Sequence, residues 1–162
     1  MGVELFRIDD RLIHGQVVVG WGQPMGLGFI VLVDDEVAGS EWERELYRMG
    51  VPPEMEVIFE TVQGAAARFA EFEREERKGI LLTGDVGSMA RLAAAVPAIK
   101  RVNLGGVHHR AGRVQRLRYV FLAPDEERTL REMEGRGVSV TAQDVPNARP
   151  VPLGDVLGGR GD

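Results

Sequence analysis

The sequence predicts an α/β protein with a mostly parallel central sheet between two layers of helices, a three-layer α/β/α arrangement. Short apolar runs of strand length alternate with segments of helical length and pattern, and such alternation favours parallel strands joined by helical crossovers. The 162 residues are the size of one domain, and no linker, repeat or low-complexity tract divides them. We expect one domain over residues 1–157 and a flexible Gly-rich tail over residues 158–162.

Six apolar runs are predicted strands, because each is short, mostly apolar and usually followed by a helical segment. They are residues 3–8, 29–33, 55–59, 79–82, 101–104 and 138–141. A seventh segment, residues 114–122, fits either an added strand or an irregular excursion. Both alternatives stay open at this stage.

Five further segments are predicted helices, namely residues 16–22, 41–49, 62–77, 89–95 and 126–134. The first is the weakest prediction, because its run of valines restricts side-chain rotation in a helix. Ser40 and Glu43 have the spacing of a capping box. Thr61, Ser88 and Asp125 are predicted N-caps, which would mark helix starts. Prolines are expected to end helices, at Pro24, Pro52-Pro53 and Pro97.

Composition excludes several classes of function. The chain has no cysteine, which rules out disulfides, thiolate metal sites and cysteine nucleophiles. No apolar run approaches the roughly 20 residues of a membrane span and no signal-type segment begins the chain, so we expect a cytoplasmic protein. A net charge of -5 argues against a general nucleic-acid binder. A local basic patch for nucleic acid or an acidic partner remains open, formed by Arg110, Arg113, Arg116 and Arg118.

Residues 7–17 carry the strongest chemical signal. His14 falls between the first predicted strand and the first predicted helix, with Arg7 and Arg11 before it. A neutral imidazole nitrogen is a nucleophile near pH 7, and guanidinium groups suit phosphate oxygens. A helix start adds backbone NH groups. The segment therefore predicts phosphoryl chemistry on His14, against the alternative of a structural histidine beside surface ion pairs.

Neighbouring residues have two interpretations each. Asp9 and Asp10 either orient His14 and the arginines or close the strand with a turn. Gly15 gives a bulky partner room to approach, or is a simple turn residue, and Gln16 begins the helix beside the expected phosphate. A second glycine pair, Gly105-Gly106, either offers backbone NH groups to that phosphate or forms a tight turn.

No cofactor or metal is expected. The chain lacks a Walker lysine and a dinucleotide-binding glycine fingerprint, so nucleotide binding has little support. The acidic run at residues 34–36 is predicted to be a solvated loop rather than a cation site. His108 and His109 are adjacent, a spacing that rarely directs two imidazoles to one ion. Trp21 is expected to pack into the core.

Several of these blocks resemble one family. Arg-Ile-Asp-Asp-Arg-Leu-Ile-His-Gly-Gln at residues 7–16 is the most specific block, followed by residues 31–37, Pro52-Pro53, Val-Asn-Leu-Gly-Gly at residues 102–106 and Gln-Asp-Val-Pro at residues 143–146. In order along nearly the whole chain, they resemble the IIB component of the mannose, fructose and sorbose family of bacterial phosphoenolpyruvate-dependent sugar phosphotransferase systems (PTS). The pair His108-His109 is a departure from the expected pattern.

The resemblance implies an α/β/α domain and a phosphorylated His14. The phosphoryl group would come from a phosphohistidine on a IIA domain and would pass to a sugar presented by the membrane subunits IIC and IID. No nucleotide, cofactor or nucleic acid takes part in this scheme. It also implies a cytoplasmic protein held at the inner face of the membrane by its partner subunits. A regulatory module that binds phosphate or another ligand without transferring it is the alternative function.

Overall fold

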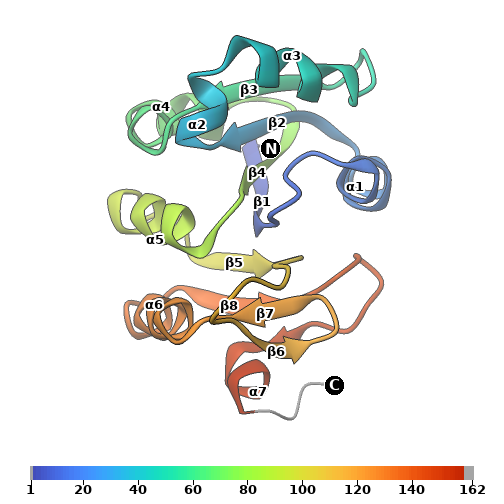
Figure 1. The fold of residues 1–162 in the computed structure, drawn as a ribbon. Helices are drawn as coiled ribbons and strands as arrows, with labels where there is room; N and C mark the ends of the chain where they lie inside the picture. The colour runs from blue at the N-terminus through green and yellow to red at the C-terminus, as the bar shows by residue number, and fades with distance from the viewer. Residues whose placement is uncertain (1, 159–162) are drawn as a thin grey trace.

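A seven-stranded sheet forms the centre of the computed structural model, which describes residues 2–158. The strand order is β3-β2-β4-β1-β5-β8-β9, and every pair is parallel except β8 with β9. Figure 1 shows the helices on the two faces of this sheet. The strands are β1 (Gly2–Ile8), β2 (Leu27–Val33), β3 (Glu56–Glu60), β4 (Lys78–Thr83), β5 (Arg101–Leu104), β8 (Ser139–Ala142) and β9 (Val151–Pro152). The predicted fold class and all six predicted strands are confirmed, with small changes of bounds.

Alternating side chains of the strands build two cores. In β2, Phe29, Val31 and Val33 face the first core, whereas Ile30 and Leu32 face the second. The first core contains side chains of α4 (Val62–Arg74), α5 (Val86–Ala95), α6 (Pro124–Gly135) and α7 (Leu153–Leu157). The second lies under the π-helix η1 (Gln16–Gly22), α1 (Gln23–Met25), α2 (Asp35–Ala38) and α3 (Glu41–Met49). Burial on both faces explains why the central strands are continuous apolar runs.

Residues 114–122, which sequence left open, form a hairpin outside the main sheet. The strands β6 (Val114–Leu117) and β7 (Val120–Leu122) pair antiparallel with each other. Val107 forms a bridge to Val120 and so ties the hairpin to the loop after β5. The β9 strand was not predicted, because two residues carry too little periodicity to detect.

Two of the predicted N-caps are confirmed. Ser40 accepts a hydrogen bond from the Glu43 NH, and Thr61 accepts one from the Gly64 NH. The prediction for Ser88 is wrong: Asp85 is the N-cap of α5, and Ser88 lies in the first turn, where both its NH and its hydroxyl donate to the Asp85 carboxylate.

Four other predictions, three for helices and one for a loop, needed correction. Asp125 lies inside the first turn of α6, because Ala123 is the N-cap and its NH donates to Glu126. The predicted helix at residues 62–77 ends at Arg74, because Glu75 is extended. Pro24 does not stop the first helix, since it occupies an early position of α1, where its missing NH costs nothing. The acidic run at residues 34–36 is not a loop: Asp34 caps α2 by accepting the NH groups of two following residues.

The predicted tail begins within the fold. The NH of Gly158 donates to the Gly154 carbonyl and so ends α7. Residues 159–162 lie outside the described part of the chain.

Candidate functional site

His14 lies on a loop that leaves the sheet at the carboxyl end of β1. The loop first continues the sheet pairing, because the Asp9 NH donates to the Thr83 carbonyl at 2.9 Å and the Asp10 NH to the Gly106 carbonyl at 2.9 Å. Leu12 then turns the chain with a φ of 60°, a left-handed conformation that costs a non-glycine residue of order 1–3 kcal/mol. Its buried side chain, part of the second core, holds that turn. The site therefore occupies the strand edge where ligands bind in open α/β folds.

Asp9 is the buried centre of the loop. Its side chain has no exposure, and one carboxylate oxygen lies 3.3 Å from His14 Nε2 and 3.3 Å from Arg7 Nη2. The other oxygen lies 3.3 Å from Arg11 Nε and accepts the Arg11 NH at 3.1 Å. Burial alone would raise the pKa of Asp9, but the contact with His14 and the charge of Arg7 outweigh it, and the pKa is held well below its usual range. Asp9 is therefore an anion at every physiological pH.

The two ring nitrogens of His14 have different surroundings. Nε2 is buried and lies within ion-pair distance of the Asp9 carboxylate, although the angle departs from that of a good hydrogen bond. Nδ1 accepts the backbone NH of Gln16 at 3.2 Å. We therefore assign the proton of neutral His14 to Nε2 and the lone pair to Nδ1. The side chain is 17% exposed, so the imidazole is partly accessible.

Arg7 is fully buried, unlike the phosphate-facing arginine that the sequence suggested. Its guanidinium donates to the Asn103 side chain and to the backbone carbonyls of Gln143, at 2.8 Å, and Asp144, at 3.2 Å. It also lies 4.8 Å from the ring centroid of Trp21, which is buried as predicted. Burial lowers the pKa of Arg7, and Asp9 offsets only part of that effect. Arg7 thus joins β1, β5 and the loop after β8 from beneath the site.

Arg11 is the arginine that reaches the surface. Its side chain is 37% exposed, and its Nη2 donates to the Gln16 side-chain oxygen at 3.2 Å. The Gln16 amide nitrogen in turn donates to Asp144 at 3.2 Å. The structure therefore brings Arg11, His14 and Gln16 together at one rim.

The glycine pair has a different use from the one proposed on sequence. The Gly105 NH donates to the Ile8 carbonyl at 2.7 Å, and the Gly106 NH points to the Asp9 carboxylate at 3.5 Å. Neither NH is left for a phosphate in this arrangement. A Cβ at Gly105 would lie only 2.4 Å from Arg7 Nη2, so this glycine provides the space for the guanidinium. Gly15 is exposed and open, which agrees with room for a partner.

Asp10 binds the loop that follows β5. Its carboxylate accepts the His108 NH at 2.7 Å and contacts His108 Nδ1 at 2.6 Å. His109 lies apart from this contact and packs edge-on against Phe121. Among residues 2–158, no group of three or more potential ligands is placed to hold a metal ion.

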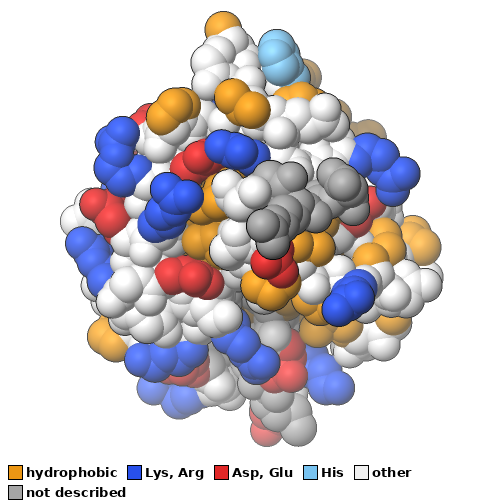
Figure 2. Space-filling view, turned by 90° about the horizontal axis from the view of Figure 1, so that it is seen from below, with side chains coloured by type: hydrophobic (Ala, Val, Ile, Leu, Met, Phe, Trp, Pro, Cys, Tyr) orange, Lys and Arg blue, Asp and Glu red, His pale blue; other side chains and the backbone are white. Residues whose placement is uncertain are grey.

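The basic patch suggested by sequence is partly neutralised. Arg113 forms a two-pronged ion pair with Glu126, and Arg116 forms one with Glu127. Figure 2, which views the molecule from the end that carries α7, shows basic and acidic side chains interspersed over that face. This arrangement gives no support to a nucleic-acid surface there.

Sequence reasoning missed three residues that surround Arg7, namely Asn103, Gln143 and Asp144. A signal was present, because all three lie at or just after the carboxyl ends of the neighbouring strands β5 and β8. Parallel strands end at the same edge of a sheet, so polar residues there meet. In the sequence alone these three residues look like ordinary polar residues, so their shared contact with Arg7 was not recognised.

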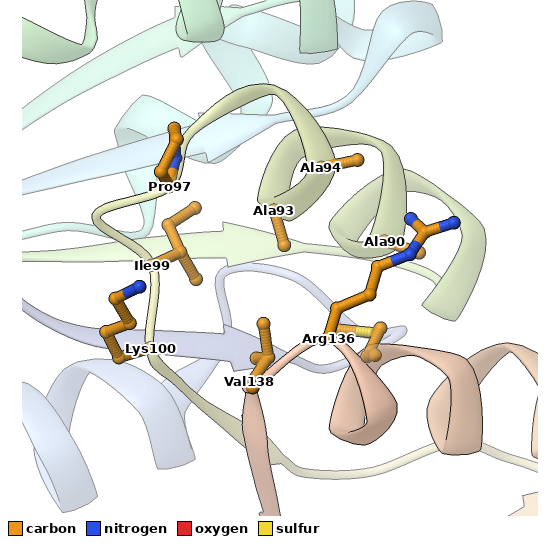
Figure 3. Close-up of a pocket in the computed structure, with 10 residues that line it drawn as sticks. Ala90, Ala93, Ala94, Pro97, Ile99, Lys100, Arg136 and Val138 are labelled. Carbon is orange, nitrogen blue, oxygen red and sulfur yellow. The ribbon is translucent and has the colours of Figure 1, made fainter.

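A separate pocket of about 380 Å³ lies beside the amino ends of β5 and β8, away from the carboxyl ends where His14 lies. Small apolar residues of α5 line it, with Ile99 and Val138 on its floor and Lys100 and Arg136 at its rim (Figure 3). No helix in the described part of the chain is both long and apolar enough to cross a membrane.

The fold and the His14 loop define a class of protein. A partly exposed histidine beside an arginine, over a buried carboxylate at the carboxyl edge of a parallel sheet, is suited to carrying a phosphoryl group. Comparison with known proteins agrees: residues 3–161 match the family described as the PTS system sorbose subfamily IIB component. The chain belongs to this family, and it is therefore a phosphocarrier of a sugar phosphotransferase system.

Individual relatives cover nearly the whole chain. The sorbose-specific EIIB component of Klebsiella pneumoniae is 29% identical over 97% of this chain and 96% of its own length. The N-acetylgalactosamine-specific IIB component 1 of Escherichia coli is 31% identical over 93% and 96%. The E. coli mannose-specific EIIAB component is 26% identical, and this chain spans 49% of it. The crystal structure of the sorbose permease IIB domain from K. pneumoniae superposes with a TM-score of 0.88, at 28% identity and over 98% of this chain and 97% of that one.

Proposed function

We propose that His14 carries the phosphoryl group, and that it does so on Nδ1. The observation that supports this choice is the contrast between the ring nitrogens: Nε2 is buried against Asp9, whereas the Nδ1 lone pair faces the Gln16 NH. A phosphoryl group can reach only the nitrogen that has a lone pair and space. Once Nδ1 is phosphorylated, the Gln16 NH loses its acceptor and becomes a donor for a phosphoryl oxygen.

The residues around His14 have separate roles in stabilising charge and in positioning the imidazole. Arg11 supplies an exposed guanidinium for the charge that spreads over the oxygens during transfer. Asp9 fixes the ring and holds the Nε2 proton, so that the imidazolium formed on phosphorylation is neutralised. Arg7 positions Asp9 from below, and Gly105 leaves room for it. Asp10 fixes the loop through His108.

The reaction is two successive transfers. The bond between phosphorus and the donor histidine of a IIA domain breaks as the bond to Nδ1 forms, and the phosphoryl group then passes from Nδ1 to a sugar hydroxyl. The relative named EIIAB unites a IIA and a IIB component in its name, which supports a IIA partner. Membrane subunits IIC and IID would present the sugar, and they would hold this protein at the cytoplasmic face of the membrane.

The test is phosphorylation by a phosphorylated IIA domain, followed by intact mass at neutral or alkaline pH, because acid hydrolyses phosphohistidine. One phosphate is expected on the native chain and on His109→Ala, whose ring lies outside the loop, and none on His14→Ala. Long-range ¹H–¹⁵N spectra of the histidine ring would then show phosphorus coupled to Nδ1. Phosphate on the His14→Ala chain, or coupling to Nε2, would contradict the proposal.

A further inference from the structure

The outer face of α3 carries a stripe of exposed apolar side chains. Trp42 is 72% exposed, Leu46 52% and Met49 81%. Their spacing of four and then three residues places them on one face of the helix. The opposite face bears Tyr47, which packs against the second core, and no residue of α3 is fully buried.

This apolar stripe (Trp42, Leu46 and Met49) is unusual for the molecule. Only five large hydrophobic side chains are exposed among residues 2–158, and three of them form the stripe. The next long helix along the chain, α4, by contrast, buries Phe69 and Phe72. Clustered apolar surface on a helix that covers an edge of the sheet marks an interaction site rather than a requirement of the core.

The helix that carries the stripe packs on the same face of the sheet as the His14 loop. The helix α2, directly before α3, starts at its cap Asp34. Both Asp34 and Leu12 of the His14 loop pack around Gly84, at 3.6 Å and 3.1 Å from the position of a Cβ there. Figure 1 shows α3 following α2 and lying along β3 at the end of the sheet. Leu12 and Ile13 of the His14 loop also share the second core with Tyr47 of α3, so a partner that approaches His14 approaches the face of the sheet that α3 covers.

Charge indicates which partner covers the stripe. Helix α3 carries three glutamates, Glu41, Glu43 and Glu45, and two arginines, Arg44 and Arg48, and Glu43 and Glu45 flank the stripe. One of the three, Glu45, is paired with Arg48 on the same helix. The whole chain has a net charge of -5. Cytoplasmic loops of membrane proteins are rich in lysine and arginine, so they complement this surface. A lipid surface that carries anionic headgroups would instead repel the glutamates.

We propose that the apolar stripe and its flanking glutamates dock this protein onto the basic cytoplasmic face of the membrane subunits that receive the phosphoryl group. This inference rests on the proposed function, since it names the surface used in the second transfer. In this proposal the IIA donor contacts the His14 loop without using the stripe. The two transfers are therefore separable by mutation.

The test uses the full chain with Trp42→Ala, Leu46→Ala and Met49→Ala together, because alanine keeps the helix. The matched control is Val114→Ala, another exposed apolar residue, on β6. Acceptance of phosphate from a IIA domain should stay within about twofold of the native rate for both proteins. Delivery to sugar by vesicles that contain the IIC and IID subunits, at limiting concentration of this protein, should fall about tenfold or more for the stripe variant alone.

A second variant tests the charge argument without removing apolar surface. Glu43→Lys with Glu45→Lys should raise the concentration of this protein that gives half-maximal delivery, and the native value should rise with salt. Native delivery by the stripe variant would overturn the proposal. So would a loss of acceptance from IIA, sedimentation of the native chain with protein-free vesicles of the same lipids, or a native dimer that the stripe variant abolishes. Failure of the native chain to accept phosphate would instead contradict the role of His14.

Discussion

At the scale of single residues, Arg7 and Arg11 have different roles, although the sequence suggested phosphate contact for both. Both precede His14, but Arg7 lies inside β1, a central strand whose last two residues are fully buried, whereas Arg11 lies on the loop after it. Position within the predicted strand was the signal that separated them. A buried guanidinium is expensive to desolvate, and it is tolerated here because Asp9, Asn103 and two carbonyls surround it.

Arg11→Ala should therefore affect chemistry more than folding. Its guanidinium is partly exposed, so its loss should change the free energy of unfolding by about 1 kcal/mol or less. Loss of one donor to the transferring group should lower the rate of phosphoryl acceptance about 100-fold. Rapid-quench transfer from phosphorylated IIA and urea unfolding measure the two effects. A folded variant with the native transfer rate would rule out this role.

Asp9→Asn should behave in the opposite way, because it leaves the buried Arg7 without its counter-charge. The expected loss is about 3–5 kcal/mol in the free energy of unfolding near pH 7. The folded-state pKa of Asp9 is lowered, so its stabilising contribution is complete above the unfolded-state value of about 4 and declines as the pH falls below it.

Urea unfolding of the native chain and Asp9→Asn across pH 2 to 8 measures this contribution. The difference between them should be constant above about pH 5 and should narrow below about pH 4. Asp10→Asn is the neighbouring control, since Asp10 contacts the partly exposed His108 instead of a buried cation. A difference that persists unchanged down to pH 2 would show that Asp9 is not held as an anion by the fold.

Gly105→Ala tests the space above Arg7. The added methyl would approach Arg7 Nη2 to 2.4 Å, so the guanidinium or β5 must move. Overpacking of this kind costs about 1–3 kcal/mol. Transfer to His14 should also slow, because displacement of Arg7 shifts Asp9. Gly135→Ala, at the end of α6, has nothing within 4 Å of the new methyl and should leave both properties unchanged; equal stability of the two variants would contradict the packing argument.

At the scale of elements, the N-cap of α5 in the structure differs from the one predicted from the sequence. Ser88 was predicted to cap this helix, but Asp85 accepts both the NH and the hydroxyl of Ser88. Asp85→Ala should cost about 1–2 kcal/mol, the value of a lost N-cap. Ser88→Ala should cost less, because the backbone cap bond remains. Chemical denaturation of the two variants decides between them, and the reverse order would restore Ser88 as the cap.

Strands were predicted better than helix ends for a physical reason. Buried parallel strands such as β2 need apolar side chains on both faces, and that requirement is visible in the sequence. A helix start depends on one side chain reaching back a few residues, and both Asp85 and Ser88 are suitable types. The two-residue β9 depends on pairing with β8 and has no local signal. The His14 loop was predictable from its own residues, whereas its support from Asn103, Gln143 and Asp144 required the strand order.

At the scale of the whole molecule, both cores share one sheet, and the His14 loop is bound to three parts of it. Hydrogen bonds join the loop to β4 through Thr83, to the loop after β5 through Gly106 and to the segment after β8 through Gln16 and Asp144. Local opening of the site would break all three. We therefore expect the site and the sheet to unfold together, as one cooperative unit.

The two tryptophans make this expectation measurable. Trp21 is buried over Arg7 at the site, whereas Trp42 is exposed on α3. Trp42→Phe should leave the free energy of unfolding nearly unchanged. Trp21 is then the only tryptophan, so the fluorescence reports on the site alone. In urea, the Trp21 fluorescence transition should then coincide in midpoint and slope with the far-ultraviolet circular dichroism transition of the sheet and helices. A fluorescence midpoint at clearly lower urea would mean that the site opens before the sheet, so that the network around Arg7 is weaker than the packing of the two cores.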